Sequence, residues 1–153
     1  MITKYERVLI AIDRSKGANV ALERAVSVAK RNKARLDVLQ VIDVNSLQYK
    51  AGGQVVIKGQ TIYDIEQADQ KYLLDLQKWL VEEKHLDRSK VFVHLRFGNP
   101  RTVIVDDFQP EYHNDLLVIG ETGMHLLKRM VAGSVASYVT RAAQCDVLIA
   151  RNK

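Results

Sequence analysis

Glycines and a serine in the last third of the chain have the types and spacing of an anion-binding loop. The sequence Gly120-Glu121-Thr122-Gly123 directly follows the apolar run 116–119, and Gly133-Ser134 comes after nine further residues. Glycine lets the backbone approach a ligand closely and adopt positive φ. The free N–H groups at the start of a helix attract an anion, and the helix dipole strengthens that attraction. A strand, this loop and a helix that opens at Gly133-Ser134 therefore predict a phosphate site.

Several other nucleotide and catalytic sites are excluded by missing residues. The chain has no G-x-x-x-x-G-K-[ST] run that would supply a P-loop lysine, and no G-x-G-x-x-G follows its first apolar run. Gly133-Ser134-Val135 is not a G-x-S-x-G nucleophile elbow. A receiver domain would carry an aspartate where Phe97-Gly98 stands. The four histidines lack metal-ligand spacing, and Asp106-Asp107 is typical of a helix surface. We therefore predict no catalytic residue and no metal held by the protein alone.

Apolar runs alternate with segments of helical periodicity along the chain. Near-continuous apolar runs are typical of strands buried on both faces of a parallel sheet, and here they predict strands at 8–12, 36–44, 91–97, 116–119 and 147–150. Apolar residues at three- and four-residue spacing predict helices after Ser15, over 62–84, from Asn99-Pro100 to a stop at Pro110, and from Gly133. Trp79 is expected in the core. Residues 45–61 predict a long connection that is mobile or carries a short hairpin.

The alternation of strands and helices predicts an α/β fold with an open, doubly wound, five-stranded parallel sheet. In the strand order 3-2-1-4-5, the sheet grows in opposite directions from the first strand. Ligands bind at the carboxyl ends of the strands beside that reversal. Asp13 follows the first predicted strand and Gly120 follows the fourth. The predicted phosphate loop therefore lies where this topology places a nucleotide-sized pocket.

Length and composition indicate a single domain over residues 1–153. No apolar run approaches the roughly 18 residues of a membrane span, and no signal-peptide pattern precedes the first strand, so no membrane association is expected. The single cysteine, Cys145, excludes an internal disulfide, fits the cytoplasm and is expected to be a buried, unreactive thiol. The net charge of +5 favours an anionic ligand, but the scattered cations predict no specific nucleic-acid site.

These features together resemble the universal stress protein family, in the ATP-binding branch marked by G-x2-G-x9-G-[ST]. The resemblance covers essentially the whole length and is carried by these segments: Asp13-Arg14-Ser15, Gly98-Asn99-Pro100, the run from Asp115 to Gly120, Gly133-Ser134-Val135-Ala136 and the final strand. It implies a Rossmann-like fold of the adenine-nucleotide alpha-hydrolase type. It also implies a cytoplasmic regulatory protein of the stress response that binds ATP, or AMP or ADP.

The resemblance further implies roles for individual residues. Asp13, next to Ile12, would contact the adenine or ribose, and Val41 would offer main-chain groups to the base edge. The phosphates would be surrounded by residues of the loop and of the following helix, namely Gly120, Thr122, Gly123, Gly133, Ser134 and Val135. Gly98 and Pro100 would shape the neighbouring rim. Where Mg²⁺ or Mn²⁺ is present, the phosphates would hold most of it.

Two departures from the family pattern concern charge. Glu121 places a carboxylate inside the loop and would oppose a triphosphate by about 1 kcal/mol, unless it points to solvent or Lys128 and Arg129 offset it. Asp146 stands where the family often has proline. In this family the last strand commonly pairs with its copy, which implies a homodimer. Antiparallel pairing of that kind would set Asp146 opposite the partner's Arg151.

Two other functions stay open on the sequence. One is an adenylate-forming or α-hydrolysing enzyme, or a slow ATP hydrolase, although no general base is evident. The other is a protein-interaction module whose nucleotide pocket is non-functional, which Glu121 favours. Residues 45–61 are a candidate lid over the base. Protein partners are not predicted.

Overall fold

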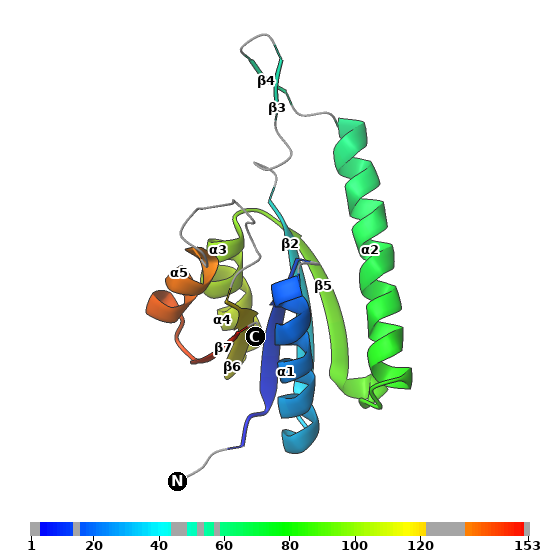
Figure 1. Cartoon of the computed structure of the whole chain (residues 1–153), viewed down its shortest axis with the longest axis vertical. Coiled ribbons are helices and arrows are strands. Elements are labelled where there is room, and N and C mark those ends of the chain that lie inside the picture. The colour runs from blue at the N-terminus through cyan, green and yellow to red at the C-terminus, as the bar shows by residue number, and fades with distance from the viewer. Residues whose placement is uncertain are drawn as a thin grey trace.

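The core of the protein is a five-stranded, all-parallel sheet (Figure 1). The computed structural model describes residues 4–13, 16–43, 49–51, 54–56, 59–121 and 134–151. The sheet strands, in spatial order, are β5 (Val91–Phe97), β2 (Arg35–Ile42), β1 (Arg7–Ile12), β6 (Leu116–Gly120) and β7 (Asp146–Ala150). In chain order this arrangement is 3-2-1-4-5, so the predicted doubly wound topology is confirmed.

Helices cover both faces of the sheet, and each face buries its own apolar cluster. The helices α1 (Lys16–Asn32) and α2 (Gly59–Glu82) cover one face, where Val8, Ile10 and Leu36 are fully buried. The other face carries α3 (Pro100–Thr102), the π-helix η3 (Val103–Phe108), α4 (Gln109–Tyr112) and α5 (Ser134–Ala142). Because both faces are covered, the strands read in the sequence as near-continuous apolar runs.

The long connection after β2 contains a short hairpin, one of the two alternatives that the sequence left open. Strands β3 (Tyr49–Ala51) and β4 (Gln54–Val56) pair antiparallel. In Figure 1 the hairpin lies above the carboxyl ends of the sheet strands. The 3-10 turn η2 (Arg88–Lys90) joins the end of α2 to β5.

The segment after β5 confirms one prediction and corrects another. The Asn99 side chain accepts a hydrogen bond from the backbone N–H of Arg101, and Pro100 occupies the first turn, as predicted. Pro110, however, does not stop the helix, which continues through Tyr112. The preceding π-turn interrupts the i→i−4 ladder, so Pro110 stands in the first turn of a new α-helical segment. A missing N–H costs little there.

Trp79 is not a core residue, contrary to the prediction from its helical spacing. Its side chain on α2 is 38% exposed, and the Lys84 ammonium lies 5.1 Å from the ring centroid. Leu73 and Leu80 on the same helix are buried. The buried residues of α2 form a narrow strip that covers the edge of the sheet. The helix therefore buries fewer side chains than its apolar spacing suggests.

A buried carboxylate ties β2 to β5 and to the turn before β6. Asp37 is fully buried and accepts hydrogen bonds from Arg35 Nη2 (2.9 Å), His94 Nε2 (2.8 Å) and Asn114 Nδ2 (3.0 Å). Burial alone would raise the pKa of Asp37, but the hydrogen bonds from His94, Arg35 and Asn114 outweigh it and hold the pKa below its usual value. Asp37 is therefore ionised in the folded protein at neutral pH.

Replacing this carboxylate should cost stability in a pH-dependent way. Asp37→Asn should lower the free energy of unfolding by about 3 kcal/mol at pH 7, because the donors of Arg35, His94 and Asn114 lose their charged acceptor. A group whose pKa is depressed by folding stabilises the protein above its unfolded-state pKa of about 3.9 and loses that contribution at lower pH. In urea unfolding measurements, the difference in the free energy of unfolding between the native protein and Asp37→Asn should therefore become smaller below about pH 4.

Asp75 on α2 provides the matched control, since its pairing with Lys71 is exposed to solvent. Asp75→Asn should change the free energy of unfolding by less than about 0.5 kcal/mol. A loss below about 1 kcal/mol for Asp37→Asn, or a gap that is constant from pH 3 to pH 7, would contradict the role assigned to Asp37.

Candidate functional site

The sheet opens at the carboxyl ends of β1 and β6. The pairing of these two strands runs from Val8–Leu116 to Ile10–Val118 and ends there. Both strands continue for two more residues, β1 to Ile12 and β6 to Gly120. The connections from β1 and β6 leave in opposite directions across the sheet, which produces a crevice at this point in doubly wound folds. The structure thus places Asp13 directly after β1 and Gly120 at the end of β6, the two neighbouring strands whose pairing stops here.

Three of the predicted site residues can offer a ligand only their main chains. The side chains of Ile12, Val41 and Val135 are 2%, 7% and 3% exposed and belong to the apolar clusters. The register of β1 with β2 ends at Ile12–Gln40, so Val41 extends beyond the end of β1. Its main chain on that side faces no strand, which suits the predicted contact with a base edge.

The other predicted residues are described in part. Asp13 is half-buried directly after β1, and Gly120 is half-buried at the end of β6. Ser134 is the first residue of α5, so the helix begins where the Gly-Ser pair predicted. Thr122, Gly123 and Gly133 lie outside the described residues, as do Ser15, Lys128 and Arg129.

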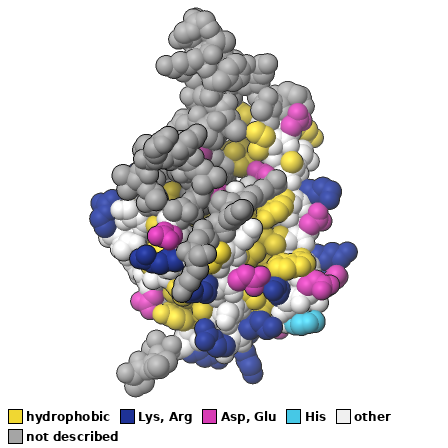
Figure 2. Space-filling view, viewed as in Figure 1, with side chains coloured by type: hydrophobic (Ala, Val, Ile, Leu, Met, Phe, Trp, Pro, Cys, Tyr) yellow, Lys and Arg dark blue, Asp and Glu magenta, His cyan; other side chains and the backbone are white. Residues whose placement is uncertain are grey.

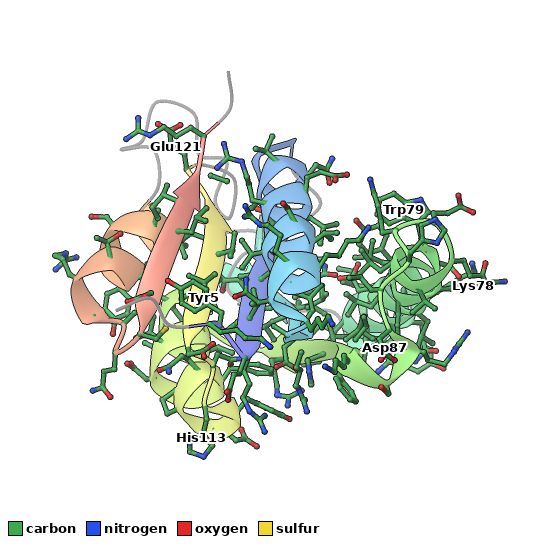
Figure 3. The ribbon with its side chains drawn as sticks, turned by 90° about the horizontal axis from the view of Figure 1, so that it is seen from below. Tyr5, Lys78, Trp79, Asp87, His113 and Glu121 are labelled. Carbon is green, nitrogen blue, oxygen red and sulfur yellow. The ribbon has the colours of Figure 1, made fainter. Side chains whose placement is uncertain are left out.

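Glu121, the acidic residue of the loop, is directed toward the end of β7 (Figure 3). Its backbone N–H donates to the carbonyl of Ala150 at 2.8 Å. Its carboxylate lies 3.7 Å from Nη1 of Arg151, and the two side chains are 42% and 73% exposed. A solvent-exposed pair of this kind is weak, but it gives the carboxylate a cationic partner at the end of β7.

Two features of this neighbourhood were not predicted from the sequence: the contact of Arg151 with Glu121 and the burial of Gln40. Arg151, which the predicted dimer sets opposite the partner's Asp146, also pairs with Glu121 of its own chain. Gln40 is 7% exposed in β2, beside Ile12 in the register, and its buried Oε1 has no hydrogen-bond partner among the described residues. A polar residue inside the apolar run 36–42 was the available signal for Gln40. No sequence signal pairs Glu121 with Arg151, because only the sheet register brings Gly120 opposite Ala150.

Gly98, one of the two predicted rim residues, stands at a position where only glycine fits without strain. Its φ is 142°, and a Cβ built there would lie 2.9 Å from Cγ2 of Val103. Its backbone N–H donates to the carbonyl of Ile42 at 3.0 Å, which ties the end of β5 to the end of β2. Pro100, the other predicted rim residue, is buried in the first turn that follows.

The remaining reactive groups do not form a second chemical centre. Cys145 is half-buried, and burial, with smaller effects of Asp146 and Asp115, raises the pKa of its thiol to about 11, as expected for an unreactive cysteine. Asp106 is exposed and accepts a hydrogen bond from the Tyr138 hydroxyl (3.2 Å). Within the described ranges, no three His, Cys, Asp or Glu side chains gather as metal ligands.

The surface and the helices add two findings. Cations and carboxylates are interspersed over the described part of the face shown in Figure 2, without a continuous basic stripe. Among the helices in the described part of the chain, none is long and apolar enough to cross a membrane.

Comparison with known proteins gives a consistent result. The sequence profile of the Universal stress protein family matches residues 4–151. A universal stress protein of Staphylococcus aureus (strain USA300) is 33% identical over 156 residues, which cover 100% of this chain and 87% of that protein.

Solved structures agree with the sequence comparisons. The universal stress protein UspA from Lactobacillus plantarum has a TM-score of 0.77 at 25% identity, covering 98% of this chain and 100% of that one. A universal stress protein solved in complex with cAMP has a TM-score of 0.70 at 20% identity, covering 99% and 100%. The match to the family profile spans almost every described residue, and the chain therefore belongs to the universal stress protein family.

Proposed function

We propose that this protein binds an adenine nucleotide, ATP in the first place and AMP or ADP as alternatives, and acts as a regulatory protein of the stress response. The observation that carries the proposal is the opening of the sheet between β1 and β6, with Asp13 on one side and Gly120 on the other. The G-x2-G-x9-G-S motif begins at this Gly120 and ends at the start of α5. Main-chain N–H groups from both segments can then converge on phosphates.

The comparisons support a nucleotide as the ligand class. One structural relative of the same topology was solved with cAMP, which is itself an adenine nucleotide. Ile12 and Val41 would contribute main-chain groups to the base side, and Asp13 would contact the adenine or ribose. Mg²⁺ or Mn²⁺, where it accompanies the nucleotide, would be held mainly by the phosphates. A cytoplasmic location is part of this proposal, since the single cysteine cannot form an internal disulfide.

The two alternative functions are weaker. An ATP hydrolase needs a general base or a residue that positions water. Among the described residues, the carboxylates at the carboxyl ends of β1, β2 and β6 are Asp13, Asp43 and Glu121, and the sequence assigns none of them that role. A pure interaction module was favoured by the charge of Glu121. The contact of Glu121 with Arg151 weakens this argument, because it gives the carboxylate a partner other than the phosphates.

Nucleotide retained through purification provides the main test. The native protein should release an adenine nucleotide on denaturation, and Gly123→Val should abolish retention, because branched methyl groups would block the approach of the phosphates. Ser134→Ala should raise the Kd for ATP roughly tenfold through loss of one hydrogen bond to a charged group. Thr140→Ala, which removes a hydroxyl bonded to Ala136 within the same helix, is the matched control and should leave the Kd unchanged.

Retention undiminished in Gly123→Val would show that the loop does not hold the phosphates. Phosphate release at more than trace rates would instead favour the hydrolase. Thermal unfolding of each variant separates loss of binding from loss of fold.

The Glu121–Arg151 pair should tune affinity for polyphosphates. Arg151→Gln should raise the Kd for ATP about threefold, because Glu121 would then be free to turn toward the phosphates. Glu121→Gln should lower the Kd by a similar factor, and the double variant should show no further effect of Arg151. The effects should shrink with AMP and at high salt, as measured by calorimetry. Arg141 is an exposed cation at the end of α5, so Arg141→Gln, which removes the same charge, is the control. Equal effects of Arg151→Gln and Arg141→Gln would refute specific pairing.

We further propose that β7 joins two copies of the chain as a homodimer. β7 is an edge strand whose Val147, Leu148 and Ile149 are only half-buried, and exposed apolar edges favour pairing. Asp146 accepts a hydrogen bond from the Tyr5 hydroxyl at 2.6 Å, so its approach to the partner's Arg151 must compete with this contact.

Light scattering after size exclusion should give about twice the 17.4 kDa chain mass at micromolar concentration. Asp146→Arg and Arg151→Asp should each weaken the dimer a few-fold, and the double exchange should restore it. A monomer at that concentration would end the dimer proposal and leave the nucleotide proposal untouched.

A further inference from the structure

A pocket lies at the opposite end of the sheet from Asp13 and Gly120. It has a volume of about 240 Å³ and is formed by the last turn of α1, the start of β2, the turn between α2 and η2, and the start of β5. We call it the amino-edge pocket, since β2 and β5 begin there. Figure 3 views the molecule from below and labels Asp87, one of its rim residues, beside the end of α2.

The floor of the amino-edge pocket is apolar. Its floor residues come from four different elements and are each less than 10% exposed: Ala29, Ala34, Leu36, Leu86 and Val91. Ligand sites of drug size measure roughly 300–1,000 Å³. The smaller volume here suits a ligand with a single ring, lying against this floor.

The rim of the pocket is rich in lysine. Lys90 Nζ donates to the carbonyl of Lys33 at 2.7 Å, which fixes its ammonium at the rim. Lys30 and Lys33 form no ion pair within the part of the chain that the structure describes. Three lysines therefore line a pocket of only about 240 Å³.

The negative groups near these lysines are already satisfied. The Asp87 carboxylate accepts hydrogen bonds from the backbone N–H (2.9 Å) and the hydroxyl (2.8 Å) of Ser89. The carbonyls at the end of α1 are capped as well, since Ala34 N–H donates to Ala29 and Lys33 N–H donates to Lys30. Such capping reduces the negative field at a helix carboxyl end. The lining holds three lysines and one aspartate, so positive charge exceeds negative charge around the floor.

We propose that the amino-edge pocket binds a small aromatic carboxylate, with its ring on the apolar floor and its carboxylate between Lys30 and Lys33. An apolar floor with a few convergent polar groups is the usual composition of a small-molecule site. Each ammonium is exposed enough to pair with an anion without first leaving another partner. This site is independent of the nucleotide crevice, so either can exist without the other.

Sodium benzoate titrated into the full ¹⁵N-labelled chain tests the proposal. Benzoate should shift the amide signals of Ala29, Ala34 and Leu86 saturably, with a Kd in the millimolar range set by its few heavy atoms. The double variant Lys30→Gln/Lys33→Gln should raise that Kd at least about fivefold. Lys71→Gln, on the exposed face of α2, is the control and should leave it unchanged.

Two further ligands separate the contributions of ring and charge. Benzyl alcohol carries the ring without the charge, inorganic phosphate carries the charge without the ring, and each should bind at least about fivefold more weakly than benzoate. The proposal is overturned by shifts that fail to saturate below about 50 mM, by an unchanged Kd in the double variant, or by benzyl alcohol or phosphate binding as well as benzoate. The ¹⁵N spectrum itself reports whether each variant is folded.

Discussion

The position of β1 between β2 and β6 is the constraint on which the candidate site depends. β1 pairs with β2 along its whole length but with β6 only as far as Ile10–Val118. The chain passes to one side of the sheet after β1 and to the other after β6. No connection therefore runs across the ends of these two neighbouring strands, and the ends can separate. Of the residues proposed to bind the nucleotide, Ile12, Asp13 and Gly120 stand at these two strand ends.

The two ends of the sheet differ in their chemistry. At the amino end, Asp37 and its three donors form a buried polar network that links β2, β5 and the turn before β6. A buried charge costs free energy unless it is fully hydrogen-bonded, and here it is. At the carboxyl end, main-chain groups and glycines dominate. The buried charge network therefore lies at the opposite end of the sheet from the proposed nucleotide site.

The last strand connects the site to the edge of the molecule. Gly120 stands opposite Ala150 in the register of β6 and β7, and the Glu121 backbone donates to Ala150. Glu121 and Arg151 then meet at the point where both strands end. On our proposal that β7 forms a dimer, the strand that joins two subunits also positions the first residue of the phosphate loop.

Near-continuous apolar runs, the Asn99-Pro100 cap and the Gly-Ser pair were enough for the sequence to determine the five sheet strands, their parallel class and the start of the last helix. These signals are local, since burial on both faces and helix capping depend on neighbouring residues. Tertiary structure alone decided the exposure of Trp79, the passage of the helix through Pro110, the partner of Glu121 and the network of Asp37. Each of these depends on side chains brought together from distant positions in the chain, or on how far one helix overlaps the sheet. Patterns among neighbouring residues in a sequence do not report such long-range contacts.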